Sequence, residues 1–255
     1  MFLVKRKLGK ALKVRKLAIF VEGYTELLFF DRLVSEIAGA HQIHIEQHQI
    51  RGGATVKRTV FVLRPRDANV EKAFYVLIVD CGSDTQVKTR ILEEHAGLSK
   101  DGYDKIIGIR DVRPSFTRQE IPQLQLGLRK YIKTSLIPVE FYLSVMEIEA
   151  WFLAEVTHFP KIDPAITVPA ISVALGFDPE HEDMSLRDEP AVDLHGSYQL
   201  AGKTYASSAD IVATISAIDY SCVYLDLKDR IPYLADFCQS MDSFLSPIVG
   251  QEQVG

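Results

Sequence analysis

The chain has few cysteines, and none of them belongs to a metal-binding or disulfide motif. Three occur in 255 residues, Cys81, Cys222 and Cys238, and no two are separated by two residues. The odd number and the spacing argue against a disulfide framework and against a zinc site. A reducing cytoplasm is therefore the expected compartment.

Long apolar runs and common catalytic motifs are also missing. No stretch reaches the roughly 20 apolar residues of a membrane-spanning helix, and the amino terminus lacks the apolar core of a signal peptide. The chain contains no Gly-x-x-x-x-Gly-Lys-[Ser/Thr] phosphate loop and no motif of a serine or cysteine nucleophile. We expect no membrane association, no P-loop nucleotide binding and no acyl transfer through a catalytic triad.

Acidic residues outnumber basic ones outside the first sixteen residues. The whole chain has a net charge of −5, yet residues 1–16 carry seven Lys or Arg and no acid. Such a basic amino-terminal arm would contact phosphates through counterion release, or it would form a solvated tail beside the first strand. The acidic remainder argues against a broad nonspecific DNA-binding face and leaves a narrow basic groove open.

What the chain does have is an alternation of apolar and amphipathic segments. This alternation predicts an α/β fold with a mostly parallel sheet flanked by helices. We expect strands at residues 17–21, 44–50, 75–79, 104–109 and 139–145, helices at 25–37, 85–94, 118–133, 208–218 and 232–245, and loops over 160–203.

The most informative residue is an acid where the first strand gives way to a helix. Residues 17–21 read as a short core strand, Glu22 and Gly23 as the turn, and Thr25 as the cap of the next helix. A carboxylate at the carboxyl end of a parallel strand lies in the crevice where α/β folds bind their ligands. Glu22 is therefore the first candidate for a functional residue.

Acids recur at the other expected strand ends, and parallel strands bring such ends together. Clustered carboxylates stay ionised only beside a cation, and oxygen ligands favour Mg²⁺ or Mn²⁺. Asp84 is better explained as a helix cap than as a ligand, and Glu26 as a first-turn acid favoured by the helix dipole. The candidate metal ligands are Glu22, Asp80, Asp111, Glu147 and Glu149.

These segments resemble the TOPRIM domains of topoisomerases, primases and OLD-type nucleases. The sequence Val21-Glu22-Gly23-x-Thr25-Glu26 is similar to the first TOPRIM motif, and Asp80-Cys81-Gly82 is similar to the glycine turn after the second strand. Asp111-Val112-Arg113 falls where the family has Asp-x-Asp, so an arginine replaces the second acid.

Residues 146–155 are similar to a Glu-x-Glu-Ala-hydrophobic motif of small stand-alone TOPRIM-like proteins, which are often linked to bacterial defence against phage. The resemblance implies a TOPRIM-like domain over residues 17–155, followed by a C-terminal helical and loop region over 156–255. Trp151 and Phe152 in this motif fit core packing better than a platform for stacking bases.

The resemblance also implies roles for individual residues. Glu22 would act in acid–base or metal-linked steps, and Asp111 would bind the metal. With the second acid absent, Asp80, Glu147 or Glu149 would complete the metal shell, and the last two would share one face if extended. Contacts to phosphate, or else ion pairs with the many carboxylates, are expected of Arg51, Arg110 and Arg113.

The resulting hypothesis is a Mg²⁺-dependent (or Mn²⁺-dependent) TOPRIM-type nuclease that hydrolyses DNA or RNA as an anti-phage effector. The alternative is a TOPRIM-fold binding subunit that acts with a partner ATPase and has little activity of its own. A homo-oligomer is compatible with either function.

Overall fold

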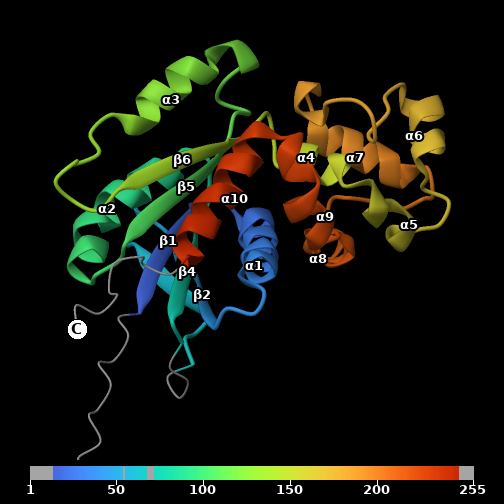
Figure 1. The fold of residues 1–255 in the computed structure, drawn as a ribbon. Coiled ribbons are helices and arrows are strands. Elements are labelled where there is room, and N and C mark those ends of the chain that lie inside the picture. Colours follow the sequence, from blue (N-terminus) through green and yellow to red (C-terminus); the bar gives the residue numbers. More distant parts are fainter. Residues whose placement is uncertain (1–13, 54, 68–71, 247–255) are drawn as a thin grey trace, which may run out of the picture.

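The structure is a computed structural model that describes residues 14–53, 55–67 and 72–246. Most of the expected basic amino-terminal arm lies outside these residues. Six strands form one sheet (Figure 1). They are β1 (Arg15–Val21), β2 (Ile43–Arg51), β3 (Thr59–Arg64), β4 (Phe74–Asp80), β5 (Lys105–Asp111) and β6 (Val139–Ser144).

Ten α-helices connect and follow the strands in the described part of the chain. None of them is both long enough and apolar enough to cross a bilayer. They are α1 (Tyr24–Ala38), α2 (Gln86–Lys100), α3 (Ile121–Arg129), α4 (Glu149–Ala154), α5 (Phe159–Ile162), α6 (Val168–Leu175), α7 (Pro190–Gln199), α8 (Ser208–Ala217), α9 (Tyr220–Leu225) and α10 (Pro232–Leu245).

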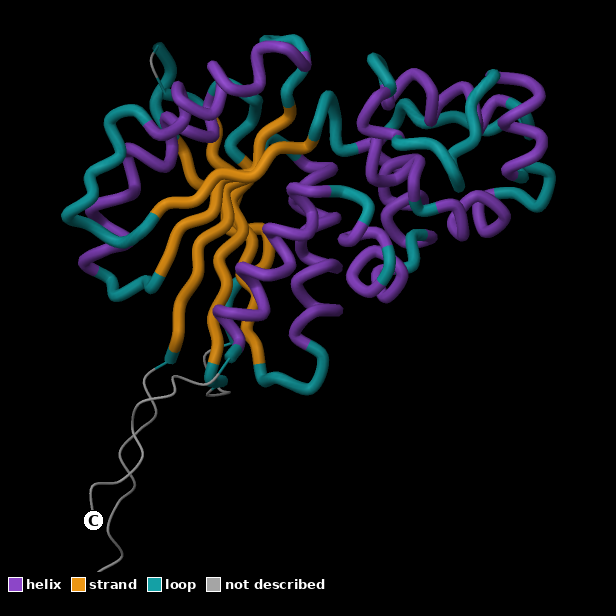
Figure 2. Tube along the Cα trace, turned by 45° about the horizontal axis from the view of Figure 1, so that its top comes forward, coloured by secondary structure: helices purple, strands orange, loops and turns teal. Residues whose placement is uncertain are grey.

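The expectation of a mostly parallel sheet is confirmed. The strand order is β3-β2-β4-β1-β5-β6, and every neighbouring pair is parallel except β2 and β3. Figure 2 shows helices on both faces of the sheet. Helices α1 and α10 contact one face, and α2 and α3 lie on the other.

Strand β1 lies at the centre of the sheet and is apolar along most of its length because both of its faces are covered. Leu17, Ile19 and Val21 belong to the core on the α1 side, whereas Ala18 and Phe20 belong to the core on the α2 side. The period-2 alternation of side chains therefore divides one strand between two cores. This firm anchoring fixes the position of the turn that follows Val21.

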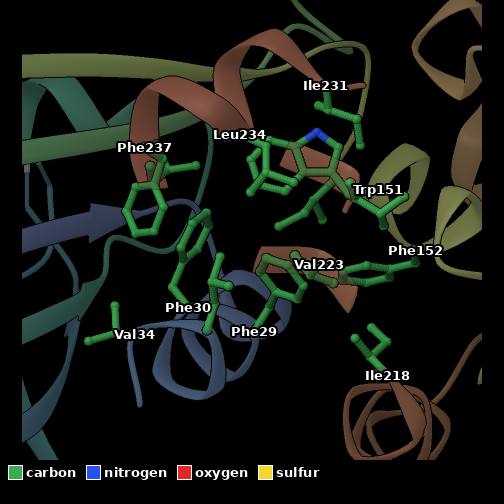
Figure 3. Packing of buried hydrophobic residues seen from close by; sticks show 14 of the residues in the cluster. Phe29, Phe30, Val34, Trp151, Phe152, Ile218, Val223, Ile231, Leu234 and Phe237 are labelled. Atoms are coloured by element: carbon green, nitrogen blue, oxygen red, sulfur yellow. The ribbon is translucent and has the colours of Figure 1, made fainter. Parts of the chain in front are cut away.

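The core on the α1 side extends into the helical region beyond residue 155. Phe29 and Phe30 of α1 lie against Trp151, with ring centroids 6.0 and 6.1 Å apart, and Phe30 lies 4.9 Å from Phe237 of α10 (Figure 3). Trp151 is 1% exposed, so it packs in the core and offers no surface to a base. Residues 17–155 and the helices that follow thus share one core.

Two expectations about the elements are wrong, and one strand is additional to those expected. Strand β3 lies between residues 50 and 75, where the expected strands leave a gap, and helices α6 and α7 lie within 160–203, where loops are expected. Asp84 does not cap α2, whose N-cap residue is Thr85. The short helices α6 and α7 begin with a proline in the first turn, where the missing N–H costs no hydrogen bond.

Candidate active site at the carboxyl edge of the sheet

Glu22 links the ends of two neighbouring strands. It directly follows β1, and its Oε1 accepts a hydrogen bond of 2.7 Å from the backbone N–H of Asp111 at the end of β5. Burial first, and the nearby charge of Glu26 second, raise the pKa of Glu22 from its ordinary value of 4.5 to about 9. The structure therefore brings together the two residues that the sequence singles out.

Glu26 also lies at this edge, in the first turn of α1. Its Oε2 accepts a 3.1 Å hydrogen bond from the N–H of Gly23, so it does act as a first-turn acid. It is nevertheless buried, and its pKa is raised to about 7 by burial first and by the charge of Glu149 second. Glu26 thus belongs to the site as well as to the helix terminus.

Asp111 is a buried acid with one carboxylate oxygen that has no hydrogen-bond partner among the described residues. It lies at the end of β5, and the oxygen without a partner is Oδ1. Its pKa lies well above the ordinary value because of burial first and then the charges of Glu22, Glu26 and Glu149. An unpartnered buried carboxylate oxygen is costly, since the group loses its hydration without a replacement.

Glu149 is the fourth member, at the first position of α4. Its Oε1 accepts a hydrogen bond of 2.7 Å from the hydroxyl of Tyr205, and burial raises its pKa. Tyr205 lies between α7 and α8, and nothing in the sequence pattern marks it as a site residue. Its position depends on the fold of the helical region.

We call Glu22, Glu26, Asp111 and Glu149 the carboxylate cluster. Within the described residues, none of the four forms an ion pair with Lys, Arg or His. Each has a pKa raised by burial, and their charges oppose one another. Such clustering of acids with perturbed pKa values is typical of functional sites.

Asp80, unlike the four acids of the carboxylate cluster, forms an ion pair with an arginine. It is fully buried at the end of β4, where it accepts hydrogen bonds from Gln49, from the backbone of Gly82 and, at 3.1 and 3.0 Å, from both terminal nitrogens of Arg51. The bidentate pair with Arg51 neutralises the carboxylate. Asp80 therefore ties the end of β4 to the end of β2.

Glu147 and Glu149 do not share one face of a strand, so that expectation is wrong. Strand β6 ends at Ser144, and Met146 has a φ of 66°, which turns the chain before α4 begins. Glu147 accepts a hydrogen bond from the N–H of Ala191 and lies 3.6 Å from Arg113. Glu147 therefore contacts the helical region and an arginine, whereas Glu149 joins the carboxylate cluster.

All three arginines expected to contact phosphate lie close to acids. Arg51 binds Asp80, Arg110 lies 3.7 Å from Asp84, and Arg113 lies 3.0 Å from Glu189 as well as near Glu147. These contacts match the alternative expectation of ion pairing with carboxylates.

The donor set of the carboxylate cluster suits a hard divalent cation, because it consists only of carboxylate oxygens. The unpartnered Asp111 Oδ1 and the uncompensated charge also suit a cation. Within the described residues, however, no three His, Cys, Asp or Glu side chains are already arranged to hold one. Glu22, for example, directs Oε1 to the N–H of Asp111. Binding a cation would therefore require side-chain rotation.

Comparison with known proteins adds little to this geometry. No protein-family model matches the chain, and no curated protein matches it. The chain is similar to a solved structure described as a cell surface hydrolase from Lactobacillus plantarum WCFS1, with 14% identity and a TM-score of 0.30. The similarity covers 52% of this chain and 53% of that one, so the chain spans about half of that protein. A likeness this distant carries no argument about function.

Proposed function

We propose that this protein is a Mg²⁺-dependent (or Mn²⁺-dependent) nuclease of TOPRIM type that hydrolyses phosphodiester bonds in DNA or RNA, as an effector in defence against phage. The observation that supports it is the carboxylate cluster. Glu26 and Asp111 are buried, Glu22 and Glu149 are half-buried, and the pKa values of all four are raised. Among the described residues, none of the four is paired with a Lys, Arg or His. They lie at the carboxyl edge of a parallel sheet, which is where α/β folds bind ligands.

The cation would be held by Asp111 and Glu22, with Glu149 or Glu26 completing the shell. Asp80 and Glu147 are less suitable, because an arginine already lies against each of their carboxylates. A bound Mg²⁺ supplies a Lewis acid that activates water and neutralises phosphoryl oxygens. The resemblance to TOPRIM domains, carried by the motif around Glu22, favours the same assignment.

The chain itself supplies the ligands and their orientation. Glu22 has a raised pKa in the cation-free protein, so it would release a proton when its carboxylate binds the cation. Tyr205 holds Glu149 in one orientation through a 2.7 Å hydrogen bond. Tyr205 is therefore a positioning residue in this proposal.

A hollow of about 450 Å³ lies beyond the end of β5 and would receive the nucleic acid. Its lining includes Arg113, Phe116, Arg118 and Met146. Phe116 offers an aromatic surface on which a base can stack, and the two arginines offer donors to phosphate. Because Arg113 and Arg118 now pair with acids, substrate would have to compete with Glu189 and Asp188.

Cleavage of plasmid DNA and of total tRNA with Mg²⁺, Mn²⁺ or EDTA tests the proposal. We expect metal-dependent cutting that is lost in Glu22→Gln and in Asp111→Asn. The matched control is Glu180→Gln, an exposed acid outside the carboxylate cluster, which should cut like the wild type. Equal cutting by Glu22→Gln and wild type would rule out the proposed site.

A second candidate function is supported by one departure from the TOPRIM pattern. Arg113 stands where the family has its second acid, and it is paired with Glu147 and Glu189. This arrangement favours a binding subunit that acts with a partner ATPase. For such a subunit we expect no cutting under any metal condition, and a cellular phenotype that survives Glu22→Gln and Asp111→Asn.

A further inference from the structure

Strand β3 is an open edge of the sheet with an apolar surface. It pairs with β2 on one side, and no other described strand pairs with its outer side. Four consecutive residues, Val60, Phe61, Val62 and Leu63, are 46, 47, 53 and 45% exposed. Unpaired backbone groups beside exposed apolar side chains form a template for adding another strand.

Both faces of β3 are apolar. Val60 and Val62 lie opposite Ile50 and His48 of β2, on the face toward α2, and Phe61 lies on the other face. Next to Val60 is a hollow of about 320 Å³, and its apolar lining includes Ile50, Leu77 and Val79. Val60 therefore belongs both to the edge and to the lining of the hollow.

Two of the basic residues at the ends of β3 have partners within the chain. Arg58 pairs with Glu94 of α2, and Arg64 pairs with Asp31 of α1. Arginines that lacked these partners would repel the same residues of a second copy. The two ion pairs therefore reduce the like-charge repulsion between two β3 edges.

The opposite edge of the sheet is not open in the same way. Strand β6 contacts α3 and α10, and its residues Leu143 and Ser144 are buried. Each copy therefore presents one open edge. A single self-complementary edge gives a closed two-fold dimer, because no second edge remains to extend a filament.

We propose that β3 pairs antiparallel with β3 of a second copy, so that one sheet runs continuously through a homodimer. This inference does not depend on the proposed function. Side chains directly opposite each other in an antiparallel pair lie on the same face. One residue of β3 must therefore lie opposite its own copy in the partner subunit, with the two-fold axis midway between them. With Val62 on the axis, Phe61 lies opposite Leu63 of the partner subunit. With Phe61 on the axis, Val60 lies opposite Val62 of the partner subunit.

Sedimentation velocity at micromolar concentrations tests the dimer. We expect a dimer for the wild type and a monomer for Val62→Lys, which places a charge at the centre of the interface. Val173→Lys is the matched control, because Val173 is 89% exposed on α6 and should leave the dimer intact. Circular dichroism confirms that each variant is folded. A monomeric wild type, or a Val62→Lys variant that stays dimeric, overturns the proposal.

Cysteine cross-linking tests the register independently. Opposite Cβ atoms on an antiparallel pair lie about 4.5–5.5 Å apart, close to the reach of a disulfide. Val62→Cys or Phe61→Cys, whichever lies on the axis, should give a covalent dimer on mild oxidation. Val173→Cys and the wild type, with its three cysteines, are the controls. Absence of cross-linking in both test variants, or equal cross-linking in the controls, contradicts the pairing.

Discussion

At the scale of single residues, the carboxylate cluster lowers the stability of the folded protein. Asp111 has a buried oxygen without a partner, and its pKa is raised by burial and by three neighbouring acids. Functional sites commonly carry such destabilising arrangements, and removing them tends to stabilise the protein at the expense of activity. The cluster should behave in this way.

Asp111→Asn should therefore raise the free energy of unfolding in EDTA by about 0.5–2 kcal/mol. The neutral amide has nearly the same shape and removes the repulsion from Glu22 and Glu149. Thermal unfolding at pH 8 measures the change. Added Mg²⁺ should raise the midpoint of the wild type and have little effect on the variant; equal shifts would mean that the cation binds elsewhere.

The cation-free protein should lose stability as the pH rises from about 4.5 to about 9. In that window an unfolded chain ionises Glu22 and Glu26, whereas the folded protein keeps their protons because the pKa values are raised to about 9 and about 7. Folding then binds protons, so alkaline pH favours the unfolded state. Urea unfolding in EDTA at several pH values should show this slope, and Glu22→Gln should flatten its alkaline part. A stability that rises with pH over this window would contradict the assignment.

Some of these residues can be predicted from the sequence and others cannot, for physical reasons. Glu22 and Asp111 follow buried apolar strands, so their meeting at one sheet edge follows from parallel pairing. Tyr205 is 56 residues from Glu149, and the contact between them depends on how the helical region folds. No local pattern carries that information.

At the scale of elements, close packing between β5 and its neighbours sets the position of Asp111. Gly108 lies in β5, and a Cβ there would come within 2.6 Å of the Phe141 ring of β6 and 2.8 Å of Ile91 of α2. Only glycine allows this approach. The strand that carries Asp111 is thus held tightly between β6 and α2.

Gly108→Ala should lower the free energy of unfolding by about 1–3 kcal/mol, because the added methyl group overpacks the core. Gly97→Ala is the matched control, since nothing lies within 4 Å of a Cβ at this exposed position of α2. That control should gain up to about 1 kcal/mol from lower backbone entropy in the unfolded chain. Chemical denaturation compares the two; equal effects would show that the contacts around Gly108 relax freely.

The helices and strands that can be predicted are those whose burial produces a pattern of apolar residues in the sequence. The central strands carry apolar runs because both of their faces are covered, and α10 was predicted with the boundaries that the structure shows. Strand β3 was missed because its apolar residues lie between basic residues at the exposed edge. The short helices α6 and α7 lie among Pro, Asp and Glu residues that are also typical of loops.

At the scale of the whole molecule, a single core joins the sheet to the helical region. Trp151 lies between α1 and the later helices, and it is the sole tryptophan of the chain. Urea unfolding followed by Trp151 fluorescence should therefore coincide with unfolding followed by far-ultraviolet circular dichroism, as expected for one cooperative unit. Separate midpoints would instead indicate that residues 17–155 form an independent domain.

Helix α10 has a consequence for how the protein is made. Its Phe237 and Leu234 are fully buried, and Phe237 lies against Phe30 of α1. Arg15 of β1 donates a hydrogen bond to the carbonyl of Phe244 at the end of the same helix. During translation, the part of the α1 face of the sheet that α10 covers, beside β6 and α1, therefore stays exposed until α10 has left the ribosome. A nascent chain that ends before α10 presents that face to chaperones and to neighbouring chains.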